Sequence, residues 1–336
     1  MASSRKTTAQ KLILGLSAVI VAVHEGEPKV FIVRGAEHAL AVGINPVNED
    51  GDALPFGPFD PDAHDTIELG LRGWIAEQTP LTPGYVEQLY TFGNRGRYAG
   101  QKDESERVIS VGYLALTRYD QPRRDRAAQA FWGDWYDYFP WEDWRQGRPK
   151  LISAVIESGL KRWVSEAADK DERNYRRDRA DLCFGLNGVA WDEEKVLERY
   201  ELLYGARLIY ESVRDKNMKV DYVLVPGRSM LYDHRRILAT AMGRLRGKVK
   251  YRPVVFELVP PEFTLLQLQK TVEGIGGHPL HKQNFRRLVE SGGLVEEVTG
   301  KKSAAAGGRP AALFRFRRDV LHERPAPGVK LAASLG

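Results

Sequence analysis

The chain has 336 residues, of which 43% are apolar and 10% aromatic. This is enough apolar surface to build buried cores, and it excludes a disordered tail protein. The length favours two domains. The formal net charge is +5, and the single cysteine, Cys183, cannot form a disulfide within the chain, so we expect a reducing, cytoplasmic location.

The first predicted element is a β-hairpin. Residues 12–23 (LILGLSAVIVAV) form an apolar run that follows Arg5, Lys6 and Lys11, as in a secretory signal. The run is too short to span a bilayer, lacks a small-residue cleavage site, and continues through a Glu-Gly-Glu-Pro turn into a second apolar run, residues 29–34. Two strands joined by that turn explain both runs, and we expect no association with a membrane.

The next part of the chain predicts an alternation of helix and strand. A loop rich in Pro, Gly and Asp over 45–62 precedes a helix over 65–79, and strand-like runs follow at 85–93 and 107–116. Asp65, with a glutamate three residues later, resembles a capping box at the start of the helix. This order is typical of a compact α/β sandwich.

Residues 119–217 differ in composition. An aromatic cluster over 131–144 is followed by helical periodicity at 151–165, a charge run over 169–181 and a helix over 192–216. Because the charge run is nearly balanced in sign, we expect a solvated surface there and not a binding surface.

A short strand over 220–226 and a helix over 233–246 complete this part. The helix has one apolar stripe, made by Ile237, Leu238, Ala241 and Leu245.

Positive charge is concentrated near the C-terminus. Residues 278–318 hold nine Lys or Arg against three Glu, a net charge of +6, so the rest of the chain sums to −1. A single cationic surface on a near-neutral body is typical of a protein that binds a polyanion, and nucleic acid is the first partner to consider.

The same region has the pattern of a winged helix-turn-helix. Thr264 can cap a first helix over 265–275, Gly276 and Gly277 supply the turn, and a second helix runs over 279–291. Strand-like runs at 294–298 and 312–317, joined by a polar, Gly-rich loop, predict the wing. On a wheel of about 100° per residue the second helix is amphipathic. Its packing side holds Phe285, Leu288 and Val289, and its polar arc of roughly 140° holds Lys282, Gln283, Arg286, Arg287 and Glu290.

Several motifs occur together in this chain. They are LPFG (54–57), YVEQLYTFG (85–93), RVISVGYLAL (107–116), WYDYFP (135–140), DHRRILATAMGRLR (233–246), YRPVVFELVPPEFTLLQLQ (251–269), HPLHKQNFRRLVESGGLVEE (278–297) and GGRPAALFRF (307–316). In combination they resemble a known family, the Nudix-related transcriptional regulators of bacterial NAD metabolism. The resemblance is to the NrtR type, and among those to the longer NadQ-like repressors of de novo NAD synthesis. It covers roughly residues 12–144 and 218–318.

The resemblance implies an α+β fold in two domains. A Nudix-like α/β/α sandwich, the effector-sensing domain, would occupy residues 12–258, with a helical insertion over 145–217 that shorter members lack. A winged helix-turn-helix DNA-binding domain would follow over 259–324.

The glutamate cluster of an active Nudix enzyme is missing. Such an enzyme uses a helix with the motif Arg-Glu-x-x-Glu-Glu to hold Mg²⁺, whereas alignment on Leu81 places Gly-Trp-Ile-Ala-Glu-Gln (73–78) at those positions. Glu68 and Glu77 lie on opposite sides of the helix. We therefore expect no enzymatic activity, no catalytic residue, no metal site and no cofactor. The alternative is a Mg²⁺-dependent Nudix hydrolase of a nucleoside diphosphate derivative with an accessory nucleic-acid-binding domain.

By resemblance, the sensing domain would bind an adenine nucleotide as effector. The effector is ADP-ribose in NrtR-type members and NAD or ATP in NadQ-like ones. Arginines suit a pyrophosphate and aromatic rings suit a base. Arg34 has an alternative role as an edge-strand surface charge, and the arginines after the YTFG strand have alternatives as solvated or DNA-contacting side chains. The candidates are Arg34, Phe56, Arg95, Arg97 and Tyr98.

The function that follows is a ligand-responsive repressor. As a homodimer it would place two recognition helices in successive major grooves of double-stranded operator DNA with a near-palindromic sequence. Gln283 suits adenine and Arg286 suits guanine, whereas the other candidates would contact phosphates or the minor groove. These others are His281, Lys282, Arg287, Lys301, Lys302, Arg309 and Arg315. A general RNA-binding module is a third hypothesis, and it would prefer single strands.

Overall fold

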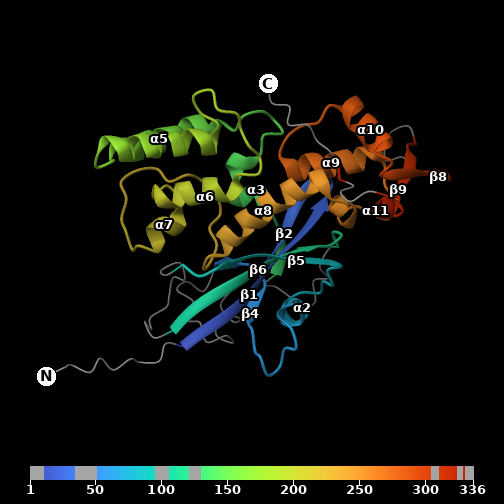
Figure 1. Cartoon of the computed structure of the whole chain (residues 1–336), viewed down its shortest axis with the longest axis horizontal. Helices are drawn as coiled ribbons and strands as arrows, with labels where there is room; N and C mark the ends of the chain where they lie inside the picture. The colour runs from blue at the N-terminus through green and yellow to red at the C-terminus, as the bar shows by residue number, and fades with distance from the viewer. Residues whose placement is uncertain are drawn as a thin grey trace.

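The computed structural model describes residues 11–34, 51–94, 106–120, 130–303, 310–323 and 328–329. Figure 1 shows a central sheet with helices on both of its faces. The predicted hairpin is confirmed: β1 (Lys11–His24) pairs antiparallel with β2 (Glu27–Arg34). Glu25 and Gly26 turn the chain with φ of 52° and 87°, the left-handed backbone that a two-residue hairpin requires.

The sheet is mixed, with strand order β3-β2-β1-β6-β5. β6 (Glu106–Leu116) runs parallel to β1 and antiparallel to β5 (Tyr85–Phe92), and both strands were predicted. Short strands complete it: β3 (Asp52–Ala53) and β7 (Ala130–Asp134) pair with β2, and β4 (Phe56–Pro58) pairs with β1.

Two helices cover opposite faces of this sheet, and β1 contributes to both cores. Alternate residues Val19 and Val21 point into the core under α8 (His234–Tyr251), whereas Ala18 and Ile20 point into the core under α2 (Ile67–Gln78). A strand buried on both faces reads as a continuous apolar run, which explains the resemblance of β1 to a secretory signal.

The N-cap of helix α2 lies one residue later than predicted. Thr66 is its N-cap, and the Thr66 hydroxyl accepts a hydrogen bond of 3.1 Å from the amide of Leu69. The predicted cap at Asp65 is therefore wrong, and Glu68 pairs instead with Arg72 on the next turn, at 2.9 Å.

The segment after β7 begins with two short helices, α3 (Trp135–Tyr138) and η1 (Pro140–Glu142). The insertion that follows is helical, as predicted, but its elements differ. A π-helical stretch, η2 (Ile152–Ile156), leads into α4 (Glu157–Ser165), and the charge run forms a further helix, α5 (Lys170–Phe184).

The helix predicted over 192–216 is two helices. α6 (Val196–Gly205) and α7 (Tyr210–Arg214) are separated at Arg207, whose φ is 61°. The strand predicted over 220–226 is also wrong, because this segment joins no ladder and Val225 donates one backbone hydrogen bond to Leu208.

The C-terminal part begins with η3 (Pro253–Glu257) and continues through α9 (Leu265–Gly276) and α10 (Lys282–Ser291). The wing follows as β8 (Val295–Lys302) paired antiparallel with β9 (Ala312–Phe316), and α11 (Val320–Glu323) packs behind it. β8 extends past the predicted end at residue 298, with a bulge that includes Gly300 at φ 76°. No helix among the described residues is both long and apolar enough to cross a membrane.

Candidate nucleic-acid interface and nucleotide pocket

The helix-turn-helix is built by local signals that the sequence displays. The Thr264 hydroxyl accepts the amide hydrogen bond of Gln267 at 3.2 Å, and the Gln267 side chain accepts that of Thr264 at 2.8 Å, which completes a capping box. Gly277 ends α9 in the left-handed region, at φ 76°. An added Cβ at Gly277 would lie 2.5 Å from the carbonyl oxygen of Glu142, so only glycine fits this turn.

Helix α10 packs through one face and exposes the other. Phe285 and Val289 are buried and Leu288 is half-buried, as the wheel predicts. The predicted DNA-contacting residues of this helix and its N-cap are all exposed: His281, Lys282, Gln283, Arg286 and Arg287. Among the described residues, none of these five side chains makes an ion pair or a side-chain hydrogen bond. All five therefore present hydrogen-bond donors to solvent without an intramolecular competitor.

The cations of the wing are exposed but partly paired. Lys301 lies 2.6 Å from Glu262, and Arg315 lies 2.5 Å from Glu296, with about 60% of each cationic side chain exposed. Exposed ion pairs of this kind contribute little stability, so exchanging a carboxylate for a phosphate costs little. Lys302 is exposed, and Arg309 lies outside the described residues.

A hollow of about 530 Å³ opens at the end of β2. Its wall combines Arg34, a predicted effector residue, with side chains that the sequence did not point to. Asp52 comes from β3, Tyr210 from α7 of the insertion, and Arg228 from the loop before α8; Gly51, Gly227 and Ser229 complete the lining. This volume suits a small organic ligand. The hollow is a candidate nucleotide site, and for that reason we call it the nucleotide pocket.

Two arginines of the nucleotide pocket flank one aromatic ring. The guanidinium carbons of Arg34 and Arg228 lie 5.4 Å and 5.3 Å from the ring centre of Phe131. Arg228 also contacts the Asp52 carboxylate at 2.7 Å. Guanidinium groups present planar donor pairs that match phosphate oxygens, and Tyr210, 45% exposed, offers a ring on which a base can stack.

Phe56, another predicted effector residue, does not line this pocket. Phe56 is only 6% exposed and packs against Tyr232 and His234 with ring centres 5.3 Å and 5.0 Å away. Its burial favours a role in the core over stacking on a base. Arg95, Arg97 and Tyr98 lie outside the described residues.

Helix α2 uses the positions of the Nudix metal ligands for packing. The Gln78 side chain accepts from the amide of Phe56 at 3.0 Å and donates to its carbonyl at 2.6 Å. Trp74 donates to the carbonyl of Pro58 at 2.9 Å. These contacts fix residues 56–58 to the helix without carboxylates. Within the described ranges, no group of three or more His, Cys, Asp or Glu side chains is arranged to hold a metal ion.

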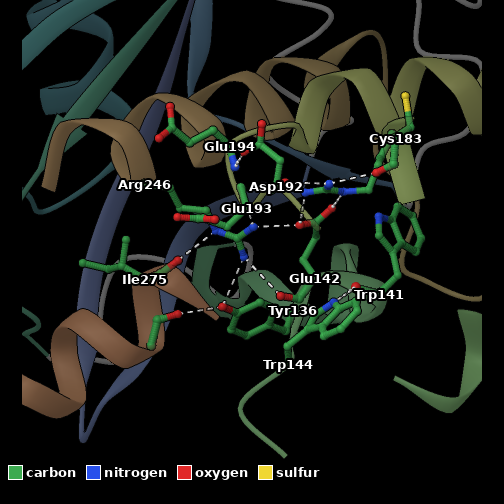
Figure 2. A network of polar contacts seen from close by, with 12 residues as sticks. Tyr136, Trp141, Glu142, Trp144, Cys183, Asp192, Glu193, Glu194, Arg246 and Ile275 are labelled. Carbon is green, nitrogen blue, oxygen red and sulfur yellow. Dashed lines mark hydrogen bonds and ion pairs between the residues drawn. The ribbon is translucent and has the colours of Figure 1, made fainter. Parts of the chain in front are cut away.

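A cluster of buried charges, which the sequence did not reveal, joins the insertion to the helix-turn-helix (Figure 2). Glu142, at 0% exposure, lies 2.6 Å from Arg199 of α6 and 2.7 Å from Arg246 of α8. Burial alone would raise the pKa of Glu142, but the two guanidinium groups outweigh it and hold this pKa below its ordinary value. The Arg246 Nε atom donates to the carbonyl of Ile275 in α9 at 3.0 Å. We call Glu142, Arg199 and Arg246 the buried charge cluster.

Comparisons with known proteins place the winged helix in a family. Residues 255–316 match the NrtR DNA-binding winged helix domain. The ADPR responsive transcriptional repressor NtrR of Acinetobacter baylyi is 44% identical over 87 residues, which are 26% of this chain and 34% of the relative. The match thus spans about a third of the relative's length.

Solved structures share the fold of nearly the whole chain. Shewanella oneidensis NrtR, crystallised with a 27mer DNA, superposes with a TM-score of 0.55 at 21% identity, covering 92% of this chain and 95% of that one. A MutT/nudix family protein from Enterococcus faecalis gives a TM-score of 0.52 at 14% identity, covering 94% and 90%. These likenesses confirm the predicted α+β fold. Residues 255–316 are therefore similar to a winged helix domain of the NrtR type, and nearly the whole chain shares the fold of Shewanella NrtR.

Proposed function

We propose that this chain is a transcriptional repressor of NAD biosynthesis genes that binds operator DNA and responds to a nucleotide. The observation that carries the proposal is the exposed cationic face of α10 in a winged helix of the NrtR type. Phosphates attract such a face, and the second helix of a helix-turn-helix is the element that enters the major groove. A repressor of this kind acts in the cytoplasm.

In this proposal α10 supplies the contacts to base edges, and α10 and the wing together supply the contacts to phosphates. Gln283 and Arg286 contact base edges, where Gln pairs with adenine and Arg with guanine. Phosphate contacts set the affinity and its dependence on salt; they come from His281, Lys282, Arg287, Lys301, Lys302, Arg309 and Arg315. A homodimer places two such helices about one helical turn apart on a near-palindromic operator.

The residues before the winged helix, 12–258, form the sensing domain in this proposal. The nucleotide pocket fits a diphosphate between Arg34 and Arg228, with Tyr210 as the stacking ring. ADP-ribose is the preferred effector, because the Acinetobacter relative is described as ADPR responsive. NAD and ATP are the competing effectors. Arg95, Arg97 and Tyr98 stay predicted contacts.

We propose no hydrolase activity, since α2 carries Gln78 and Trp74 where an active enzyme needs carboxylates. Incubation with Mg²⁺ or Mn²⁺ and ADP-ribose or NADH should leave the nucleotide intact. Metal-dependent release of a nucleoside monophosphate would instead favour the alternative, a Nudix hydrolase.

A mobility-shift titration tests the proposal. The full chain is titrated onto duplex DNA from its own upstream region, onto a shuffled duplex of equal length, and onto single-stranded RNA. We expect the upstream duplex to bind at least about 10³-fold more tightly than the shuffled one, and saturating ADP-ribose to change that affinity. Equal affinity for all three would contradict the DNA-binding half. An operator affinity that does not change with ADP-ribose but changes with NAD or ATP would reassign the effector.

A further inference from the structure

One buried aromatic segment runs from the nucleotide pocket to the turn between α9 and α10. It comprises residues 135–144, and we call it the linking segment. Trp135, Tyr138, Phe139 and Trp141 are each 0% exposed. A segment packed this closely cannot absorb a displacement by rotating its side chains. A shift at one end is therefore transmitted to the other.

Tyr138 is the residue of the linking segment that contacts the pocket wall. Its hydroxyl donates to the Asp52 carboxylate at 2.8 Å, and Arg228 contacts the same carboxylate oxygen at 2.7 Å. Burial, together with Asp52, raises the pKa of Tyr138 well above its ordinary value, so the hydroxyl stays a donor. A phosphate that binds Arg228 competes with Asp52 for that guanidinium. Ligand binding thus changes the contacts of the carboxylate that Tyr138 holds.

The insertion and α8 hold the middle of the linking segment. The backbone carbonyl of Tyr138 accepts two hydrogen bonds from Arg235, at 3.1 Å and 2.5 Å. Arg235 is paired at 2.9 Å with Glu211 of α7, and Glu211 accepts the amide of Met230 at 3.1 Å. Met230 follows the pocket residue Ser229. This chain of hydrogen bonds therefore connects the pocket wall to the backbone carbonyl of Tyr138.

At its far end, next to the turn between α9 and α10, the linking segment donates hydrogen bonds to the last carbonyls of α9. The Tyr136 hydroxyl donates to the carbonyl of Gly274 at 2.7 Å, and the amide of Trp144 donates to the carbonyl of Gly277 at 2.8 Å. The last carbonyls of a helix have no partners within that helix. Here the linking segment supplies them, so it sets where α9 ends and where the turn into α10 begins.

The buried charge cluster fixes this far end in one position. Arg246 spans from the Glu142 carboxylate to the carbonyl of Ile275, as Figure 2 shows. Arg199, from the insertion, donates to both oxygens of the same carboxylate, at 2.6 Å and 2.8 Å. A fully buried ion pair tolerates few alternative geometries, because separating its members leaves an uncompensated charge. The turn therefore has one defined position, and a small displacement of the linking segment changes that position.

We propose that the linking segment couples the nucleotide pocket to DNA binding, with Tyr138 as the positioning residue at the pocket and Tyr136 as the positioning residue at the turn. This inference rests on the proposed function, since it needs a ligand in the pocket. Coupling requires a contact that differs between the free and bound states, and the partner of Arg228 is that contact.

The test uses the full chain with ADP-ribose as probe. Tyr136→Phe removes the hydrogen bond to Gly274 and keeps the ring, at a site that touches neither the pocket lining nor the exposed face of α10. Calorimetry gives the ADP-ribose affinity, mobility shift gives the operator affinity with and without ADP-ribose, and amide hydrogen exchange follows residues 274–281. The matched control is Tyr85→Phe on β5. The Tyr85 hydroxyl accepts a hydrogen bond from Lys248 of α8 and donates one to Glu87 of β5.

We expect Tyr136→Phe to bind ADP-ribose as the parent does, while the ligand-induced change in operator affinity falls at least about five-fold. The ligand-induced change in exchange at residues 274–281 should fall with it. Tyr138→Phe should lose the same response, and Tyr85→Phe should keep it. If ADP-ribose binds the parent and Tyr136→Phe responds as fully as the parent, the inference is overturned and the proposed function stands. If ADP-ribose does not bind the parent, the effector assignment fails and takes the inference with it.

Discussion

The exposed face of α10 and the buried charge cluster contain the same residue type in opposite situations. Arg286 and Arg287 lie in water with no partner among the described residues, whereas Arg199 and Arg246 are at most 1% exposed and share the Glu142 carboxylate. An arginine in water is available to a phosphate, but a buried arginine is committed to the fold. Burial and not residue identity separates a DNA contact from a structural support.

Removing Glu142 should have the largest effect. Glu142→Gln keeps the side-chain volume but leaves two buried guanidinium groups without a counter-charge, so we expect the free energy of unfolding to fall by about 3–5 kcal/mol. Urea denaturation measures this loss. Glu68→Gln is the control, since Glu68 is exposed and pairs with Arg72 at the surface, and such pairs contribute about 1 kcal/mol or less. Equal losses in the two variants would remove the distinction between buried and exposed charges.

A second buried group should make stability depend on pH. Burial lowers the pKa of His234 to about 3, and its Nδ1 atom accepts the amide hydrogen bond of Leu54 at 3.1 Å. Below pH 6.5 the unfolded chain takes up a proton that the folded chain excludes, so stability falls as pH falls from 6.5 towards 3. We expect this histidine to cost about 2 kcal/mol by pH 5.

His234→Asn checks this expectation, because the Asn oxygen can still accept the bond from Leu54 but does not titrate. Urea denaturation at pH 7 and pH 5 should show a smaller loss in the variant than in the parent. His322→Asn, which replaces an exposed histidine of α11, is the matched control. A loss in His234→Asn as large as in the parent would show that His234 is protonated in the folded state.

The parts of the fold that follow local rules could be predicted from the sequence. The cap at Thr264, the glycine turn at Gly277 and the amphipathic pattern of α10 each have a signal in the local sequence, and the structure reproduces all three. Helix α5 could not be predicted, because its buried residues Ala180, Cys183 and Phe184 lie only at its C-terminal end. A charge run without apolar periodicity gives no helical signal.

Contacts between distant residues were also beyond sequence reasoning. Glu142 is 57 residues from Arg199 and 104 from Arg246, and nothing in their local patterns indicates that they meet. The nucleotide pocket is similar: Arg34 was found from its place at a strand end, but Tyr210 comes from the insertion and Arg228 from the loop before α8. The insertion therefore contributes to the pocket wall, which its composition did not show.

The central claim is that the exposed face of α10 contacts operator DNA, and the operator affinity of Arg286→Ala tests it most directly. Its control is Arg173→Ala, which removes an equal charge from an exposed position on α5. We predict that Arg286→Ala weakens binding to the upstream duplex by about 1–3 kcal/mol and relaxes sequence preference, while Arg173→Ala binds as the parent does. Unchanged affinity in Arg286→Ala, or an equal loss in both variants, would contradict the account.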